Sequence, residues 1–354
     1  MNDNSNHRSK NKPKTWFPHV AIVHSEVNKD YFPTDEAYFA EFECIKRSQK
    51  VAEILETQYG QRTSVVAADD RIGEKLLKLK PDFCINFVDT IRGSGSLAAG
   101  IPSLFELFQL PYLGSNTLAL SLTYNKFLTK TLLRNAGIPT PRYQLFRTYS
   151  QNVDYDLHFP LILKPNEEHG SVGIDANSVV ATERELHQKL KELLNLFDQP
   201  ILAEEYIEAD REVTGFVYES SQVRTHLNEV VYQKPEGQMF KLVTFEAKWA
   251  ADMGKTPIIN YKSDTLDNTY LVNSLKRDIK RAFATLKMDD FARFDIVMDK
   301  YENYYFVDCN ANPELGPEST QNGFKFENTI YDLMRHNYKE LNSEVDNFAT
   351  SQTA

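Results

Sequence analysis

Two strand candidates near the C-terminus carry acidic residues in a pattern that suggests metal chemistry. The segments FARFDIVMD (291–299) and NYYFVDCNAN (303–312) are predicted to form an antiparallel hairpin whose loop is Lys300–Asn303. Residues two apart on a strand share a face, so the polar side chains gather on one face of this hairpin. The predicted register pairs Asp299 with Tyr304, Asp295 with Asp308, and Arg293 with Asn310.

Facing carboxylates of this kind favour a bound cation. Side chains directly across a strand pair have Cβ atoms about 5 Å apart, where like charges repel. Mg²⁺ relieves that repulsion, because it prefers carboxylate oxygens together with substrate phosphates. Asn310 would add a neutral oxygen ligand, and Arg293 would stabilise negative charge that develops during a reaction. In the alternative interpretation, Arg293 only neutralises the two aspartates on a solvated sheet face.

A glycine-containing loop upstream is a candidate phosphate site. In PLILKPNEEHGSVGI (160–174), Lys164 stands at the end of an apolar strand candidate, and Gly170, Ser171 and Gly173 follow it. Glycines let backbone N–H groups approach a phosphate, and a lysine adds a point charge. The spacing differs from that of a P-loop, so the alternative is a hairpin turn with a surface lysine.

Other charged residues are ambiguous when each is taken alone. Lys126 lies in a helical segment and would be exposed to solvent there. Lys248 beside Trp249 is typical of a lysine whose carbon chain packs on apolar surface while its amine reaches solvent. Acidic side chains near a nucleoside accept hydrogen bonds from its amino or hydroxyl groups, but otherwise they are strand-edge charges. The acidic candidates in ILAEEYIEADREV (201–213) are Glu204, Glu205 and Glu212.

In the first third of the chain, predicted strands alternate with helices, as expected of a parallel sheet. A strand is predicted at His19–Ser25, followed by a helix at Asp35–Tyr59 that stops at Gly60. Thr63–Ala68 and Pro81–Val88 are short apolar runs typical of strands buried on both faces. Strands that alternate with helices favour a parallel arrangement.

The later elements indicate a change of architecture after residue 142. One helix is predicted from the cap Ser121 to the stop Gly137, with Leu128, Leu132 and Leu133 on one side. Strand candidates follow at 142–146, 160–165, 177–182, 201–207 and 211–219. Further helices are predicted after a capping box of Thr182 and Glu185, at 268–287, and at 324–341.

Size and composition narrow the class of protein. A length of 354 residues suggests two or three domains, and no apolar run approaches the ~18 residues of a membrane span. The polar first 14 residues lack the apolar core of a secretory signal. The net charge of −10, without a long basic cluster, argues against a nucleic-acid partner. Cys44, Cys84 and Cys309 are too few and scattered for a disulfide framework or a zinc site, which favours the cytoplasm.

The order of these fragments along the chain is more specific than any one of them. From residue 111 to residue 319 the sequence resembles the D-alanine–D-alanine ligases of the ATP-grasp superfamily. The fragments that carry the resemblance are PYLGS (111–115), the helix with Lys126 that leads to GIPTP (137–141), PLILKP with GSVGI (160–174), ILAEEYI (201–207), FEAKW (245–249), ARFDIVMD (292–299) and FVDCNANP (306–313).

The resemblance implies a three-domain ATP-grasp fold of the α/β and α+β classes. A parallel-sheet N-terminal domain would precede a central lid domain and a C-terminal catalytic domain, with ATP between the last two. The expected division is a tail at 1–15, domains at 16–120, 121–203 and 204–342, and a second tail at 343–354.

The resemblance also implies roles for individual residues. Phosphate contacts would come from Lys126, Lys164 and Lys248, under a mobile lid that contains Gly170, Ser171 and Gly173. The nucleoside would be held by Glu204, Glu205 and the backbone at Ile207 around adenine, and by Glu212 at the ribose. Two Mg²⁺ ions, with Mn²⁺ as a substitute, would bind Asp295, Asp308 and Asn310. The expected catalytic residues are Arg293 beside the transferring phosphoryl group, Lys248, and Ser319 at the carboxylate of the second substrate.

The sequence departs from the family mainly where the first substrate would bind. NFVDTIRGSGSLAAGIP (86–102) replaces the family's histidine–glycine and glycine–glutamate–aspartate segment, and Gly170 replaces one of two lid serines. Trp249 replaces a tyrosine, Asp308 a metal-binding glutamate, and Glu314 a glycine. We therefore expect the ATP machinery of the family together with an altered pocket for the first substrate.

The expected function is an ATP-dependent carboxylate–amine ligase that forms an amide or peptide bond through an acyl phosphate. Its substrate would be an amino acid or a similar molecule other than D-alanine. Two alternatives stay open: an ATP-grasp kinase that phosphorylates a small molecule and stops, and a non-catalytic nucleotide-binding protein. The expected partners are small-molecule acids and amines in the cytoplasm, without nucleic acid or membrane, and a homodimer is compatible with the resemblance.

Overall fold

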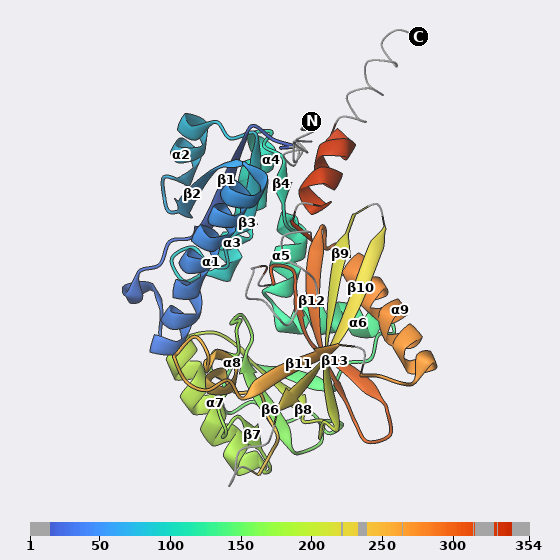
Figure 1. Cartoon of the computed structure of the whole chain (residues 1–354). Coiled ribbons are helices and arrows are strands. Elements are labelled where there is room, and N and C mark those ends of the chain that lie inside the picture. Colours follow the sequence, from blue (N-terminus) through green and yellow to red (C-terminus); the bar gives the residue numbers. More distant parts are fainter. Residues whose placement is uncertain are drawn as a thin grey trace, which may run out of the picture.

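Three β-sheets organise the chain (Figure 1). The computed structural model describes residues 15–220, 222–232, 239–263, 265–313, 315, 329–330 and 332–341. The first sheet is parallel, and the second and third sheets are antiparallel. This combination confirms the predicted α/β and α+β classes.

The first sheet follows the predicted alternation of strands and helices. It contains β1 (His19–Ser25), β2 (Arg62–Ala68), β3 (Phe83–Phe87) and β4 (Tyr112–Leu113), in the order β2-β1-β3-β4. β1 and β3 are buried along their whole length, whereas β2 is partly exposed. The prediction that 63–68 is buried on both faces is therefore wrong, because β2 lies at the edge of the sheet.

The long helix α1 (Asp35–Tyr59) has the predicted bounds. The side chain of Thr34 accepts a hydrogen bond from the Ala37 amide at 3.1 Å, which satisfies one free donor of the first turn. Gly60 ends the helix with a φ of 65°, a conformation that glycine adopts without steric cost. The sequence patterns missed four short helices, η1 (Lys29–Tyr31), α2 (Ile72–Leu79), α3 (Gly95–Ala98) and α4 (Gly100–Leu107).

The second sheet forms the lower part of the molecule in Figure 1, with α7 (Glu183–Phe197) against it. Its strands are β5 (Tyr143–Phe146), β6 (Leu161–Pro165), β7 (Val179–Val180) and β8 (Ile201–Glu205), in the order β5-β8-β6-β7. The predicted cap of α7 is confirmed, since Thr182 accepts a hydrogen bond from the Glu185 amide. The Glu185 carboxylate bonds to the Ala181 amide, one residue before the position that a capping box uses.

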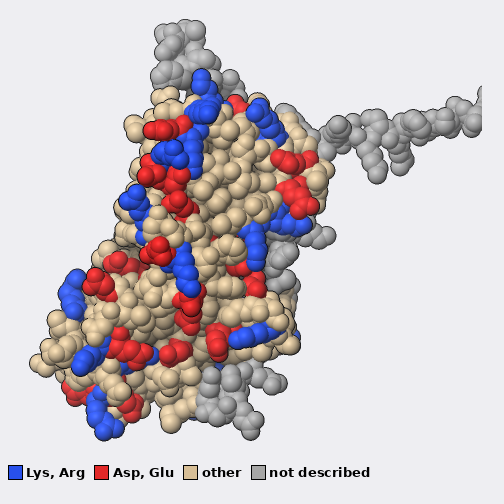
Figure 2. Space-filling view, turned by 90° about the vertical axis from the view of Figure 1, so that its left-hand side faces the viewer, with Lys and Arg blue, Asp and Glu red and all other residues tan. Residues whose placement is uncertain are grey.

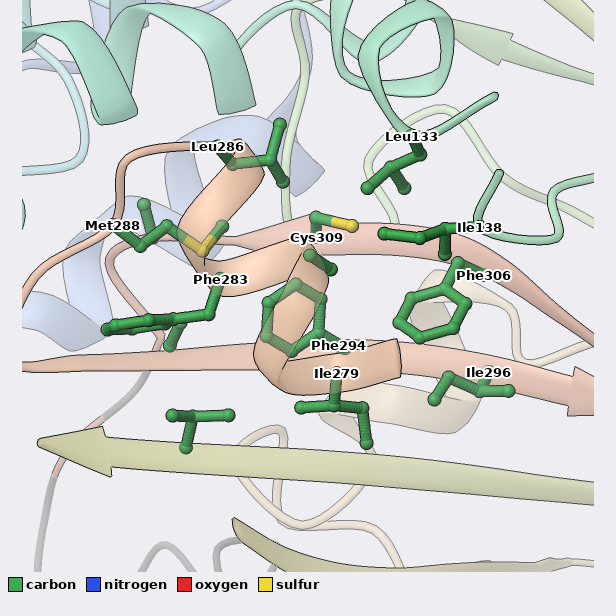
Figure 3. Packing of buried hydrophobic residues seen from close by; sticks show 14 of the residues in the cluster. Leu133, Ile138, Ile279, Phe283, Leu286, Met288, Phe294, Ile296, Phe306 and Cys309 are labelled. Carbon is green, nitrogen blue, oxygen red and sulfur yellow. The ribbon is translucent and has the colours of Figure 1, made fainter. Parts of the chain in front are cut away.

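The third sheet holds the predicted acidic hairpin. Its strands are β9 (Arg211–Glu219), β10 (Val223–Tyr232), β11 (Ile259–Ser263), β12 (Phe291–Met298) and β13 (Tyr304–Asn310), in the order β11-β10-β9-β12-β13. Helix α9 (Thr269–Thr285) packs on one face, where Ile279 meets Phe294 and Phe306 (Figure 3). A Cβ at Gly215 of β9 would overlap Ile279, so glycine is needed for this close packing. β10, β11 and α8 (Phe245–Trp249) were not predicted.

The single helix predicted from Ser121 is in fact two helices. Ser121 lies inside α5 (Thr117–Thr123), and α6 (Lys126–Asn135) begins after Asn125. The Asn125 side chain accepts a hydrogen bond from the Leu128 amide at 3.0 Å, so this residue starts the new helix. Of the three leucines predicted on one side of the helix, Leu133 is buried, whereas Leu128 is 44% exposed.

Helices α5 and α6 share a buried cluster with the third sheet, and α6 also contacts β5 of the second sheet. Leu120 and Leu133 belong to the same buried cluster as Leu275 of α9. Packing thus groups residues 117–135 with the later part of the chain, and the division of domains at residue 121 stays a prediction.

The end of the described chain is helical at residues 329–330 and 332–341, within the helix predicted at 324–341. Among the described helices, none has the length and apolarity to cross a membrane. One face of the molecule carries interspersed basic and acidic side chains (Figure 2).

Candidate functional site

A cavity between the second and third sheets brings most of the predicted site residues together. Its empty volume is about 1220 Å³, which includes space open to solvent. The lining includes Lys126, Lys164, Ser171, Glu204, Glu205, Ile207, Glu212, Lys248, Arg293, Asp295 and Asp308. The predicted residues Gly170, Gly173 and Asn310 are not among the described residues of its lining. Ser319 and Glu314 lie outside the described residues.

The register of the acidic hairpin is confirmed where the chemistry was predicted. Arg293 faces Asn310, and Asp295 faces Asp308. At the loop end the prediction is wrong, because Met298 rather than Asp299 faces Tyr304. A β-bulge at Val307 adds one residue to β13 and restores the predicted pairing beyond it.

The bulge also changes which side chains face the cavity. Val307 and Asp308 are consecutive residues, yet both line the cavity. On the opposite face, Phe294 and Phe306 pack at a ring-centroid distance of 5.9 Å (Figure 3). The extra residue therefore allows one strand to present two neighbouring side chains to the site without losing its core contacts.

Arg293 pairs with only one of the two aspartates. Its Nε lies 3.0 Å from Asp295 Oδ1, and its Nη2 lies 3.2 Å from Asp295 Oδ2. Arg293 is only 5% exposed and so does not lie in solvent, whereas the side chain of Asp295 is 32% exposed. Burial opposes ionisation of Asp308, but the charges of Lys126, Lys164 and Arg293 hold its pKa below the ordinary value.

The oxygen donors at this hairpin fit Mg²⁺. Asp295 and Asp308 face each other, and Asn310 adds an amide oxygen on the same strand, where it accepts a hydrogen bond from the Asn312 amide at 2.8 Å. Among the described residues, no group of three or more His, Cys, Asp or Glu side chains forms a metal site. Phosphate and water oxygens would therefore have to complete the coordination, which is the usual arrangement for Mg²⁺.

Lys126 is the first residue of α6, and its ammonium turns into the cavity. The Nζ donates a hydrogen bond to the carbonyl of Glu168 in the glycine-containing loop. Burial lowers the pKa of Lys126, while the charge of Asp308 opposes that shift. The expectation that Lys126 alone would be exposed to solvent is wrong, because capping by Asn125 starts the helix at the wall of the site.

Glu204 is fully buried and pairs with two lysines. Its Oε2 lies 3.1 Å from Lys164 Nζ, and its Oε1 lies 3.1 Å from Lys130 Nζ. The predicted contact of Glu204 with adenine stays a prediction. Lys130 was missed by the sequence analysis, although it stands four residues after Lys126 and so shares a face of the helix.

The other end of the cavity contains the residues predicted to hold the nucleoside. Glu205 Oε1 lies 2.9 Å from His158 Nδ1. Glu212 accepts a hydrogen bond from the Tyr232 hydroxyl at 2.6 Å, and burial raises the pKa of Glu212. The Tyr206 hydroxyl donates to the Lys241 carbonyl at 2.7 Å, which ties the chain that leads to α8 to the cavity wall.

The glycine-containing loop is attached to the helix that carries Lys248. Gly170 and Gly173 have φ angles of 66° and 73°, which explains glycine at both positions. The Trp249 indole N–H donates a hydrogen bond to the Gly170 carbonyl at 3.0 Å. Trp249 also packs on Phe39 of α1 at a ring-centroid distance of 6.0 Å. These contacts bring α1, the loop and α8 together over the cavity.

A buried pair connects the same loop to α1. His169 Nε2 lies 3.4 Å from Glu41 Oε2, and Glu41 is 1% exposed. Burial alone would lower the pKa of His169, but the hydrogen bond and charge of Glu41 raise it to about 9. The Thr90 hydroxyl donates to the other Glu41 oxygen at 2.8 Å. No sequence pattern indicated this pair, because its members are 128 residues apart (169 minus 41).

We expect the His169–Glu41 pair to make the stability of the protein depend on pH. The pKa of His169 is raised from 6.5 to about 9 on folding, so the pair stabilises fully below about pH 6.5 and loses that effect as pH rises through about 9. The free energy of unfolding, measured from pH 6 to pH 10, should therefore fall more for the wild type than for His169→Gln. The difference between the two falls should be at most about 3 kcal/mol.

The matched control is His187→Gln, which removes a histidine from a pair with Glu183 on α7. The control should follow the pH dependence of the wild type. An identical pH dependence in His169→Gln and the wild type would contradict the assigned pair.

Comparison with known proteins points to one family. Residues 132–334 match the family model described as D-ala D-ala ligase C-terminus. The D-alanine–D-alanine ligase of Carboxydothermus hydrogenoformans is 26% identical over 291 residues, which cover 78% of this chain and 87% of the relative. An uncharacterised protein, y4sG, from Sinorhizobium fredii is 31% identical over 220 residues, 62% of each chain.

Solved structures show the same fold. The D-alanine–D-alanine ligase of Bacillus anthracis in complex with ATP is similar with a TM-score of 0.68 and 16% identity, over 92% of this chain and 99% of that chain. The ligase of Coxiella burnetii is similar with a TM-score of 0.65 and 14% identity, over 95% and 99% of the two chains. The predicted ATP-grasp fold is thereby confirmed.

Proposed function

The chain belongs to the D-alanine–D-alanine ligase family of ATP-dependent carbon–nitrogen ligases, and on that basis we propose that it joins a carboxylate to an amine through an acyl phosphate. The observation that carries the proposal is the pair of facing aspartates, Asp295 and Asp308, in one cavity with Lys126, Lys164 and Lys248. Acidic and basic groups in this arrangement suit the transfer of a phosphoryl group from ATP.

The proposed reaction has two steps. A carboxylate oxygen of the first substrate attacks the γ-phosphorus of ATP, and the bond to the β-phosphate oxygen breaks to release ADP. The amine of the second substrate then attacks the acyl carbon, loses a proton, and displaces inorganic phosphate. The lysines hold the phosphates in place, and Arg293 offsets the charge on the phosphoryl group during transfer. The loop at 170–173 and α8 exclude water that would hydrolyse the acyl phosphate.

Asp295, Asp308 and Asn310 are the residues that would hold Mg²⁺. A bound Mg²⁺ supplies positive charge next to the oxygens of the nucleotide phosphates. The number of ions, and the acceptance of Mn²⁺, belong to the proposal. Asp308 is one methylene shorter than the glutamate of the family, but it keeps the carboxylate oxygens that Mg²⁺ prefers.

We further propose that the acid substrate differs from D-alanine. Support comes from residues 86–102, which replace a family segment and include the partly buried Asp89. Burial raises the pKa of Asp89 to about 6. Asp89 accepts a hydrogen bond from Asn312 Nδ2 at 2.8 Å, so the rewritten segment contacts the end of the acidic hairpin. Trp249, which replaces a tyrosine of the family, contacts the glycine-containing loop at Gly170.

The test is a panel of amino acids, offered singly and in pairs with MgATP, with phosphate release as the readout. Ligase activity with a pair other than two D-alanines would support the proposal, and product formation from D-alanine alone would contradict the altered specificity. Hydroxylamine trapping separates the mechanisms, since only an acyl phosphate gives a hydroxamate. A phosphorylated small molecule without hydroxamate would identify a kinase, and nucleotide binding without any ADP release would identify a non-catalytic protein.

We expect Trp249→Phe to raise the KM for ATP about fivefold, with a smaller effect on kcat. The variant keeps the aromatic contacts with Phe39 and Phe245 but loses the hydrogen bond to the Gly170 carbonyl, which is worth about 1 kcal/mol. Steady-state kinetics at varied ATP concentration gives both constants.

The control for this variant is Trp16→Phe, which removes the other of the two tryptophans. It should leave both kinetic constants unchanged and make Trp249 the sole source of indole fluorescence. An unchanged KM in Trp249→Phe would show that the indole hydrogen bond does not position the loop.

A further inference from the structure

Lys130 is a buried lysine that lies behind the cavity rather than in it. It is 2% exposed and is not among the described residues of the cavity lining. Its Nζ donates hydrogen bonds to Thr140 Oγ1 at 3.2 Å and to the Phe306 carbonyl at 3.2 Å. It also forms an ion pair with Glu204, whose Oε1 lies 3.1 Å away.

Glu204 lies between Lys130 and the lysine that faces the cavity. Its second oxygen, Oε2, is 3.1 Å from Lys164 Nζ. β6 and β8 fix this contact, because Ile162 pairs with Glu204 and Lys164 is two residues further along the same face of β6. Lys164 lines the cavity and is 7% exposed, whereas Glu204 is fully buried.

The charges of the three side chains have a direct consequence for the cavity. A carboxylate paired with Lys164 alone would cancel its charge and leave nothing to attract a phosphate. With Lys130 on the other oxygen, the group of three carries a net charge of +1 (two lysines and one glutamate). Lys164 and Glu204 both line the cavity, so this net positive charge is felt there.

We propose that Lys130 is a positioning residue that neutralises Glu204 from behind, so that Glu204 holds Lys164 in place while Lys164 keeps its positive charge for the nucleotide phosphates. The inference rests on the proposed binding of ATP in this cavity. Removal of Lys130 should therefore weaken binding through the phosphates and leave binding of the nucleoside nearly unchanged.

Calorimetric titration of Lys130→Met with ATP and with adenosine tests this inference. We expect the Kd for ATP to rise at least tenfold, because Glu204 then neutralises Lys164 in a region of low dielectric constant. The Kd for adenosine, which has no phosphate, should change less than about twofold. The matched control is Lys189→Met, which removes a lysine of α7 that is 6% exposed and pairs with Asp175 and Glu192. None of these three residues lines the cavity, so its Kd for ATP should match the wild type.

A second variant separates charge compensation from a purely structural role. In Lys130→Met/Glu204→Gln the net charge beside the cavity is again +1, so the Kd for ATP should return to within about threefold of the wild type. A double variant that binds ATP as weakly as Lys130→Met would overturn the inference. Should Lys130→Met fail to fold, the double variant is compared with Glu204→Gln. Glu204→Gln carries one more positive charge than the double variant, so it should bind ATP more tightly. Equal affinities of these two variants for ATP would overturn the inference.

The wild type distinguishes this inference from the proposed function. ATP binding by the wild type with an unchanged Kd in Lys130→Met would overturn the role of Lys130 alone. Absence of ATP binding by the wild type would overturn the proposed function and the role of Lys130 together.

Discussion

Replacement of Asp308 by asparagine is expected to lower the rate of ATP-dependent ligation about 10³-fold. The change keeps the size of the side chain and one acceptor oxygen but removes the charge that faces Asp295. It also removes the carboxylate whose charge is stabilised by Lys126, Lys164 and Arg293. The measurement is kcat at saturating ATP over a series of Mg²⁺ concentrations, and higher Mg²⁺ should not restore the rate.

A second aspartate in the same hairpin provides the control for Asp308→Asn. Asp299 lies at the turn, where it accepts hydrogen bonds from Tyr301 and Asn303. Asp299→Asn should leave kcat unchanged, because the turn is outside the cavity lining. Near-normal activity in Asp308→Asn would contradict the assignment of a metal site to this hairpin.

The second large effect is expected for Arg293→Lys, with a fall in kcat of about 10²-fold and a smaller change in the KM for ATP. Lysine keeps the charge but cannot form the two parallel hydrogen bonds that Arg293 makes with Asp295. The orientation of Asp295 and the charge beside the phosphoryl group are both changed. Single-turnover measurement of ADP formation isolates the step that should slow.

Arg281→Lys is the control for Arg293→Lys. Arg281 pairs with Asp278 on α9 at 3.0 Å, away from the cavity. The control should retain the wild-type rate of ADP formation. A similar rate in Arg293→Lys and Arg281→Lys would show that Arg293 has a structural rather than a catalytic role.

The elements with strong local signals could be predicted from the sequence. α1 has both a threonine cap and a terminal glycine, and both of its bounds were correct. α8 could not be recognised, because five residues are too short for a helical period to appear. The missed boundary between α5 and α6 depends on one side chain, since Asn125 caps a helix in the middle of a pattern that is helical on both sides.

The acidic hairpin illustrates a limit of predicting register from sequence. The predicted loop was one residue too short, and the bulge at Val307 was not foreseen. The two errors cancel, so Asp295 and Asp308 face each other as predicted although Asp299 and Tyr304 do not. A bulge shifts the alternation of side chains by one residue, and in a short strand that shift cannot be told from a slip in register.

The partners of the site residues were harder to predict than the residues themselves. Lys126, Lys164 and Lys248 were expected at the phosphates from the order of family fragments, and all three line the cavity. The contacts of Glu204 with Lys130 and of His169 with Glu41 join segments that are distant in the sequence. Only the packing of three sheets brings such segments together.

Every described residue that lines the cavity lies between Lys126 and Asp308, and none comes from the first sheet or from α1. The residues that line the cavity can therefore stay the same while residues 16–120 change, provided that the contacts of Glu41 with His169 and of Phe39 with Trp249 are kept. Chimeras that exchange residues 16–120 between relatives would test whether this portion decides which product is formed.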